Sequence, residues 1–227
     1  MMANKRLGLV IDLDRCIGCW TCATACKAEN GVALGNWWNR ILNVEGAATG
    51  SPGMVAGEVK MTNLPVQCMH CENAPCVKAC PVGATYKRED GIVMQDYNKC
   101  IGCRMCMAAC PYGAKVFNWG EPQTGVSLAG VKLGNPAVPE RPRHVAEKCT
   151  FCVERVDQGE LPACVAACPA LTRTFGDLND PNSEVSILIR ERNGSQLLPE
   201  FGTDPNIYYL PARRHHPIVE KTPSYGG

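Results

Sequence analysis

The sequence predicts an α+β fold made of two interlocked, cysteine-rich modules, with many loops, long insertions and an extended C-terminal tail. Three observations support this prediction. All 16 cysteines fall into four sets of four. Short apolar runs of strand or helix length lie between the sets. The 22 glycines and 17 prolines divide the rest of the chain into turns and loops.

Each cysteine set ends in the spacing C-x3-C, and a proline follows three of the four sets. The sets are Cys16, Cys19, Cys22 and Cys26; Cys68, Cys71, Cys76 and Cys80; Cys100, Cys103, Cys106 and Cys110; and Cys149, Cys152, Cys164 and Cys168. The run C-x2-C-x2-C-x3-C-P is typical of bacterial ferredoxins, where it holds cubane iron–sulfur clusters. The four sets therefore predict two ferredoxin-like modules with four [4Fe–4S] clusters, and such a chain is most simply a conductor of single electrons.

The sets are expected to work in pairs. In two-cluster ferredoxins the fourth cysteine, which we expect to begin or lie in a helix, binds the other cluster. Sets two and three are joined by an expected hairpin, Ala84–Arg88 and Ile92–Asp96, with Asp90 and Gly91 in its turn. Sets one and four then pair by elimination. The predicted ligand groups are Cys16, Cys19, Cys22 and Cys168; Cys26, Cys149, Cys152 and Cys164; Cys68, Cys71, Cys76 and Cys110; and Cys80, Cys100, Cys103 and Cys106.

Two other uses of cysteine fit the spacing less well. Structural zinc sites use pairs of C-x2-C, but they have no use for a third cysteine or for the C-x3-C-P that follows. Disulfides are typical of small secreted domains, and two cysteines separated by only two residues are poor bridge partners. We therefore favour iron–sulfur clusters over both.

Three residues within the sets have predicted supporting roles. Gly18 and Gly102 each lie between the first two cysteines of a set, where glycine allows a loop whose N–H groups point at a cluster. His70 lies between Cys68 and Cys71. Because no cysteine is missing, we predict that His70 tunes a cluster by hydrogen bonding and does not ligate iron.

Composition narrows the function classes. The 23 basic and 22 acidic side chains nearly balance, so nothing indicates a nucleic-acid partner. No apolar run approaches the 18 or more residues of a membrane helix, and the N-terminus lacks a signal-peptide pattern. With few aromatic residues, the chain is expected to depend on metal–thiolate bonding for stability, and to be largely disordered without its clusters.

The expected organisation follows the pairing of the sets. The first module comprises residues 1–60 and 143–190, the second 61–117, an insertion loop 118–142 and an extended tail 191–227. Expected strands are Leu7–Leu13, Met61–Gln67 and Thr172–Leu178; expected helices are Phe151–Gln158 and Val185–Arg192; and residues 46–58 are an expected surface loop. For the insertion loop 118–142, two interpretations fit about equally well, a contact with a partner protein and a disordered surface loop.

Two further segments allow more than one interpretation. Trp37 and Trp38 are expected to cover a cluster as a local core, with a partner interface as the alternative. The run 213–216, Arg-Arg-His-His, suits a solvated or partner-facing charge cluster better than a metal or phosphate site, because the prolines around it keep the tail extended.

With these motifs in hand, the chain resembles the four-cluster iron–sulfur subunit of the dimethyl sulfoxide reductase family. It is similar to the electron-transfer subunits of dimethyl sulfoxide, polysulfide, tetrathionate and arsenate reductases. The resemblance covers roughly residues 7–190. The matching elements are Val10–Leu13, Cys16–Cys19, Ala25–Asn30, Cys68–Cys76, Cys100–Cys103, Ala109–Gly113, Lys148–Cys152, Pro162–Cys164, Gly176–Leu178 and Asp180–Pro181.

The resemblance implies a subunit without catalytic activity of its own. Its partners would be a catalytic subunit with a molybdenum or tungsten bis-pterin cofactor and a membrane-anchor subunit that reacts with quinone. The cluster of Cys16 would lie nearest the pterin, followed by those of Cys26 and Cys68, and the cluster of Cys80 would lie at the outer end. The complex would be membrane-associated with this chain as a peripheral subunit, exported with a signal-bearing partner; a cytoplasmic location is the alternative.

Two other function classes stay open at this point. The chain suits a soluble cytoplasmic wiring subunit of a formate dehydrogenase, hydrogenase or aldehyde oxidoreductase complex. It also suits a binding module whose clusters are only structural or sensory. Because substrate chemistry would reside in the partner, the sequence names no terminal substrate.

Overall fold

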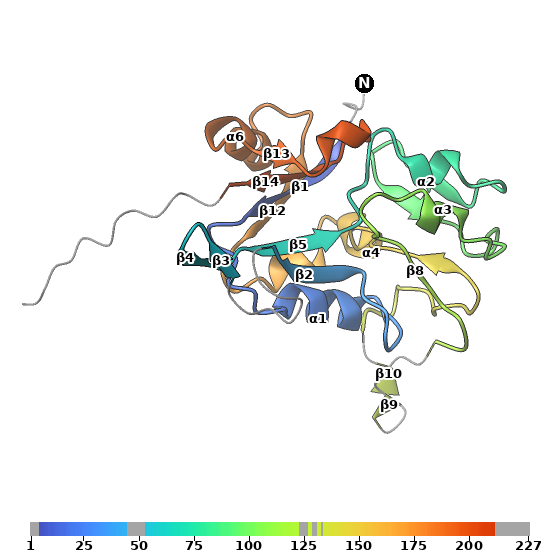
Figure 1. The fold of residues 1–227 in the computed structure, drawn as a ribbon. Coiled ribbons are helices and arrows are strands. Elements are labelled where there is room, and N and C mark those ends of the chain that lie inside the picture. The colour runs from blue at the N-terminus through green and yellow to red at the C-terminus, as the bar shows by residue number, and fades with distance from the viewer. Residues whose placement is uncertain (1–4, 45–52, 123–126, 129–130, 133, 212–227) are drawn as a thin grey trace, which may run out of the picture.

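The computed structural model describes residues 5–44, 53–122, 127–128, 131–132 and 134–211, and it confirms the mixed content of helices and strands (Figure 1). The strands are β1 (Leu7–Asp12), β2 (Asn39–Asn43), β3 (Gly53–Val55), β4 (Glu58–Lys60), β5 (Asn63–Gln67), β6 (Thr85–Lys87), β7 (Val93–Gln95), β8 (Val116–Phe117), β9 (Ser127–Leu128), β10 (Val131–Lys132), β11 (Ala146–Glu147), β12 (Arg173–Asp177), β13 (Ser195–Gln196) and β14 (Ile207–Leu210). The helices are α1 (Thr21–Glu29), α2 (Pro75–Lys78), α3 (Met105–Ala108), α4 (Val153–Val156), α5 (Ala163–Ala166), α6 (Glu184–Glu191) and the 3-10 turn η1 (Pro199–Phe201).

A four-stranded sheet with the order β12-β1-β14-β13 joins distant parts of the chain. Strand β1 pairs antiparallel with β12, so that Leu9 faces Phe175, and parallel with β14, so that Leu9 also faces Ile207. The first strand leads into cysteine set one, and β12 follows set four. The sheet therefore brings together the segments next to the two sets that are farthest apart in the sequence, and Figure 1 shows β1 beside β12.

The two faces of this sheet bury different partners. Because side chains alternate along a strand, Leu9 and Ile11 point into the main core, which also contains most of the buried cysteines. Val10 points the other way and packs with Val185 of α6 and Leu210 of β14. Helix α6 begins at the Ser183 N-cap, whose hydroxyl accepts from the Ser186 N–H, as expected for a helix start.

The extended tail expected from residue 191 is wrong for residues 195–210. These residues form β13, η1 and β14, and both Ile207 and Leu210 are buried. The Tyr209 hydroxyl also donates to the Pro65 carbonyl at 2.7 Å. The five residues between Pro205 and Pro211 are enough for a strand when the sheet supplies a partner edge. The Arg-Arg-His-His run at 213–216 lies outside the described residues.

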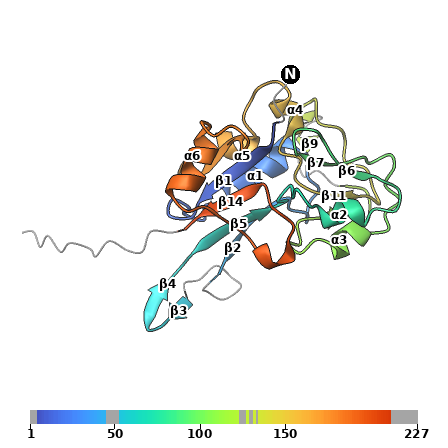
Figure 2. The ribbon, with the colours of Figure 1, turned by 90° about the horizontal axis from the view of Figure 1, so that it is seen from above.

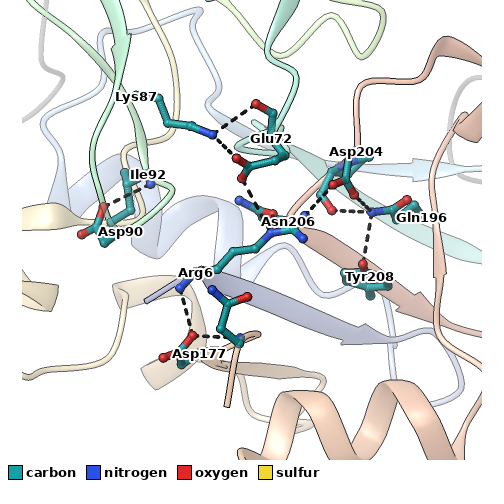
Figure 3. Close-up of polar contacts among 12 residues, drawn as sticks. Arg6, Glu72, Lys87, Asp90, Ile92, Asp177, Gln196, Asp204, Asn206 and Tyr208 are labelled. Atoms are coloured by element: carbon teal, nitrogen blue, oxygen red, sulfur yellow. Dashed lines mark hydrogen bonds and ion pairs between the residues drawn. The ribbon is translucent and has the colours of Figure 1, made fainter. Parts of the chain in front are cut away.

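A polar network fastens this C-terminal segment to both halves of the molecule (Figure 3). Arg6, just before β1, forms ion pairs with Asp204 at 3.1 Å and with Glu72 at 3.8 Å. Glu72 directly follows Cys71 and also pairs with Lys87 of β6. Backbone bonds add to the network, because the Glu72 N–H donates to the Asp204 carbonyl and the Asn206 N–H to the Met69 carbonyl.

The second half of the molecule contains α2, α3 and the expected hairpin. Strands β6 and β7 pair antiparallel, with Tyr86 opposite Met94. A ribbon of β2 and β5 links the halves across the boundary expected at residue 60, with Ile41 opposite Pro65. The surface loop expected over 46–58 is wrong where the structure describes it, because β3 and β4 form a hairpin that projects from the body (Figure 2).

The expected insertion loop 118–142 is anchored to the body at several points. Strands β9 and β10 form a short hairpin within it. Asn135 donates to the Glu29 carboxylate at 3.0 Å, and buried Arg141 lies over the Trp38 ring at 5.2 Å. Trp38 is itself buried, as the expectation of a local core required, so at these points the insertion packs on its own chain.

Within the described residues, the structure contains no helix that is both long enough and apolar enough to cross a membrane.

Replacing Ile207 by alanine should show that β14 holds the fold together. The side chain is fully buried, so its truncation should lower the free energy of unfolding by about 2–5 kcal/mol. The matched control is Phe201→Ala in the same segment, where the side chain is 59% exposed and the loss should be within about 0.5 kcal/mol. Anaerobic thermal unfolding measures both, and equal losses of Tm would contradict the strand's role.

Candidate metal centres

All four cysteine sets share one backbone feature. The residue just before the second cysteine has a positive φ in each set: 70° at Gly18, 44° at His70, 70° at Gly102 and 56° at Phe151. This left-handed conformation is unfavourable for residues other than glycine. It is retained at His70 and Phe151 because the loop must turn its peptide groups in the same direction at every set. The sequence showed only the two glycines, so two of these turns were missed.

The helices position the third cysteine of each set more often than the fourth. Cys76, Cys106 and Cys164 lie in α2, α3 and α5, and each of these helices ends before the fourth cysteine and its proline. The residue before a proline is disfavoured in helices, which explains these ends. The expectation that the fourth cysteine begins or lies in a helix holds only for Cys26, in α1, where Lys27 replaces the proline and the helix continues.

The structure brings sulfurs from different sets together. Burial raises the pKa of Cys26 strongly, and the neighbouring sulfurs of Cys149, Cys152 and Cys164 raise it further. Asn30 donates to two sulfurs of this group, Cys152 at 3.6 Å and Cys26 at 3.8 Å. Cys26 of set one and three cysteines of set four therefore lie close together in the protein interior.

Two more groups of sulfurs cross set boundaries. Burial raises the pKa of Cys16, with smaller contributions from the charges of Cys22 and Cys168. Burial also raises the pKa of Cys71 to about 12, and the sulfurs of Cys68, Cys76 and Cys110 act in the same direction. Each of these groups includes the fourth cysteine of another set.

Of the four cysteines in the remaining predicted group, three are not fully buried. Helices α2 and α3 pack against each other, and α3 carries the buried Cys106. Cys103 is exposed, while Cys80 and Cys100 are partly buried. The Ala84 N–H donates to the Cys80 sulfur at 3.2 Å, a contact that favours a thiolate there.

These surroundings fit a positively charged iron centre. A thiol with a raised pKa stays protonated at neutral pH, whereas iron binds the thiolate. Peptide N–H groups already point at sulfur, from Phe151 to Cys149 and from Thr172 to Cys168, both at 3.4 Å. The iron of a bound cluster would supply the charge that keeps the buried thiolates ionised.

Buried polar atoms without a protein partner give an independent test of the fit. Among the described residues, Gln67 Nε2, His70 Nε2 and Thr150 Oγ1 are buried and make no hydrogen bond within the protein. All three belong to residues inside or beside a cysteine set. Buried donors are normally paired, and cluster sulfides are acceptors that would pair them. The residues present therefore fit iron–sulfur clusters.

The His70 side chain is positioned to donate a hydrogen bond from Nε2 and does not act as a base. Its Nδ1 accepts from the Val93 N–H at 3.1 Å, which assigns the proton to Nε2. Complete burial lowers the pKa of His70 well below its usual value, and nearby Lys148 lowers it further, so the ring is neutral. The ring stacks on Phe151 at 3.7 Å, which joins the left-handed residues of sets two and four. A role in tuning a cluster stays a prediction.

Three buried cations near the cysteines were missed by sequence reasoning. Arg173 in β12 donates to Cys22 and Cys164 sulfurs. Lys115 donates to Thr85 Oγ1 at 2.9 Å and Gln95 Oε1 at 2.7 Å, and Lys148 donates to the carbonyls of Cys149 and Val93. A basic residue within a short strand or loop gives no sign in the sequence that it points inward.

Gly102→Ala should test the close packing of the cysteine loops. A Cβ at Gly102 would lie 2.6 Å from the His144 carbonyl oxygen, in addition to the strain of its positive φ. The φ strain alone is roughly 1–2 kcal/mol. Gly83→Ala is the matched control, because Gly83 also has a positive φ but has nothing within 4 Å of its Cβ position. Iron content and Tm should fall clearly more in the first variant, and equal losses would mean that packing against His144 is unimportant.

Comparison with known proteins agrees with this geometry. Two family models described as 4Fe–4S dicluster domains match the chain, one over residues 59–125 and 137–178 and the other over residues 15–84. A Halobacterium salinarum protein, provisionally named as the iron–sulfur subunit of a dimethyl sulfoxide reductase, is 54% identical over 89% of this chain and 78% of its own length.

Two other relatives extend the comparison. The arsenate respiratory reductase iron–sulfur subunit of a Shewanella species is 41% identical over 90% of this chain and 96% of its own length. The menaquinone reductase iron–sulfur cluster-binding subunit of Nitratidesulfovibrio vulgaris is 40% identical over 91% and 89%. The chain thus belongs to the family of iron–sulfur electron-transfer subunits of the dimethyl sulfoxide reductase type, which are components of larger reductase complexes.

Proposed function

We propose that this chain carries four [4Fe–4S] clusters that relay single electrons between a catalytic subunit and a quinone-linked membrane subunit. The observation that carries the proposal is the burial of the cysteines. Cys19 and Cys103 are exposed, and they occupy equivalent positions in sets one and three. The corresponding Cys71 and Cys152 are buried. An electron relay needs this arrangement, because its outer clusters must lie close to partner proteins and its inner clusters must be shielded from solvent.

The proposed ligand groups are the four predicted from the cysteine spacing. They are Cys16, Cys19, Cys22 and Cys168 for cluster 1; Cys26, Cys149, Cys152 and Cys164 for cluster 2; Cys68, Cys71, Cys76 and Cys110 for cluster 3; and Cys80, Cys100, Cys103 and Cys106 for cluster 4. The grouping of sulfurs described above supports the first three. Internal repetition supports the fourth, since sets two and three end in the related runs Cys-Pro-Val-Gly-Ala and Cys-Pro-Tyr-Gly-Ala.

Interactions between these groups support the order 1-2-3-4. Groups 3 and 4 are neighbours because α2, which carries Cys76, packs against α3, which carries Cys106. The charge of Cys22, in the first group, raises the pKa of Cys164 in the second, where burial is the larger cause. Burial raises the pKa of Cys149 in the second group, and Cys68 of the third also contributes. When bound, each cluster accepts and releases one electron at a time. The β2–β5 ribbon joins the two proposed modules and so holds the groups at a fixed spacing.

Exposed apolar side chains surround both ends of the proposed relay. Near Cys19 these are Ile17 and Trp20, and near Cys103 they are Ile101 and Met105. Apolar side chains gathered at the surface are typical of protein interfaces. We place the catalytic subunit, with its molybdenum or tungsten bis-pterin, at the end with Cys19. The membrane-anchor subunit then contacts the end with Cys103.

The names of the relatives favour this function over a cytoplasmic wiring subunit of a formate dehydrogenase, hydrogenase or aldehyde oxidoreductase complex. They include respiratory reductase subunits and a menaquinone reductase subunit. We propose that the chain is a peripheral subunit of a membrane-associated complex and that it is exported with a signal-bearing partner. The terminal substrate is set by the catalytic partner.

Replacement of Cys110 by serine tests the reciprocal pairing. The native protein, isolated without oxygen, should contain roughly sixteen iron atoms, four for each proposed cluster. Loss of Cys110 should damage the cluster of Cys68, Cys71 and Cys76 and leave that of Cys100, Cys103 and Cys106 intact. Electron paramagnetic resonance of the reduced protein distinguishes the two. Damage confined to the cluster of Cys100, Cys103 and Cys106 would reject the proposed exchange of ligands between sets two and three. A protein that contains zinc and little sulfide would reject the presence of iron–sulfur clusters.

The relay itself is tested at its proposed outer end. Cys103→Ser should convert cluster 4 towards a [3Fe–4S] form with a raised potential, because an exposed ligand is lost. Activity of the intact complex with quinol should fall strongly. Activity with an artificial dye that reaches a cluster nearer the catalytic site should persist. If both activities fall together while the complex stays assembled, either the cluster order or the relay is wrong.

A further inference from the structure

Arg173 occupies a position between two of the proposed clusters. It begins β12, directly after set four, and its side chain is buried, with 4% of the residue exposed. One terminal nitrogen, Nη2, lies 3.5 Å from the Cys22 sulfur, and the other, Nη1, lies 3.8 Å from the Cys164 sulfur. Cys22 belongs to the first proposed group and Cys164 to the second. One guanidinium therefore contacts a ligand of each cluster.

The positive charge of Arg173 has no carboxylate partner in the part of the chain that the structure describes. Its other hydrogen bonds are to neutral amides, Gln67 Oε1 at 2.6 Å and Asn39 Oδ1 at 3.2 Å. The charges that interact with it most strongly are those of Cys164 and Cys22. A buried cation normally needs an opposite charge close by. Here the thiolates of Cys164 and Cys22 supply the opposite charge, and no carboxylate in the described residues neutralises Arg173. Its charge therefore acts on the proposed clusters.

The two amides fix the geometry without weakening the charge. Asn39 lies in β2 and Gln67 in β5, directly opposite each other in the ribbon. Each presents its oxygen to a different nitrogen of the guanidinium. The fork of an arginine suits such a site, because it can serve two acceptors at once, whereas the point charge of a lysine cannot span them.

We propose that Arg173 is a positioning residue that raises the reduction potentials of clusters 1 and 2 together. This inference rests on the proposed ligand groups. Each reduction adds one negative charge to a cluster, and a cation in contact with its ligands stabilises that added charge. Because the same guanidinium contacts proposed ligands of both clusters, one side chain raises the two potentials together.

Redox titration of the intact complex, followed by electron paramagnetic resonance, tests the proposal. In Arg173→Gln, reduction of clusters 1 and 2 should become about tenfold less favourable, which is about 59 mV for each one-electron couple. The potentials of clusters 3 and 4 should stay in place. Cys19→Ser and Cys103→Ser identify the signals of the two end clusters, because each removes one exposed ligand.

A second variant keeps Arg173 in place and cancels its charge. Asn39→Asp puts a carboxylate next to the guanidinium, at a position where the amide nitrogen makes no hydrogen bond within the described residues. It should lower the same two potentials as Arg173→Gln does. This variant decides the matter if Arg173→Gln does not assemble.

Arg155→Gln is the matched control. It removes the same unit of charge near set four, but the Arg155 side chain is 25% exposed and is paired with Glu29 and Glu160. The reduction potentials of the clusters in the Arg155→Gln complex should match those in the unmodified complex. The proposal is overturned if Arg155→Gln shifts the potentials equally, if all four clusters shift together, or if Asn39→Asp and Arg173→Gln leave both potentials unchanged. If the unmodified complex shows no [4Fe–4S] transitions, the proposed function itself fails, and this outcome is distinct from the others.

Discussion

The burial of thiolate charge is the constraint on which the rest of the structure depends. Nine of the 16 cysteines are buried. Burial raises the pKa of six of them, Cys26, Cys71, Cys76, Cys149, Cys152 and Cys164. Iron supplies most of the compensating charge in the proposed clusters, and the protein supplies the rest. Peptide N–H groups, unpaired amide donors and the buried cations Arg173, Lys115 and Lys148 all lie around the sulfurs. Apolar side chains such as Ile11, Ile92 and Ile207 pack around the same cysteines, and a smaller apolar cluster lies between the sheet and α6.

The sequence predicted the structure well wherever residues close together in the chain determine it. The cysteine sets, the β6–β7 hairpin, β1 and α6 all followed from local patterns. The left-handed turns at His70 and Phe151 could not be predicted, because a histidine or phenylalanine adopts this conformation only when tertiary packing requires it. The inward direction of Arg173 was hidden for a similar reason, since its partners come from four separate segments, around Cys22, Asn39, Gln67 and Cys164.

The C-terminal strand shows how composition can mislead. Prolines at 199, 205 and 211 indicated an extended tail. A short segment needs no core of its own when an open sheet edge is available. Strand β14 finds this edge at β1, and the Arg6 network of Figure 3 then fastens the adjoining turn next to set two.

The position of β14 in the sequence has a consequence for assembly in the cell. This strand follows every cysteine of the chain, and it fills the place between β1 and β13 in the sheet. During synthesis, all four sets leave the ribosome before the strand that closes the sheet over them, since chains emerge from the N-terminus. The sheet of β12, β1, β14 and β13 can therefore be completed only after all 16 cysteines have been synthesised.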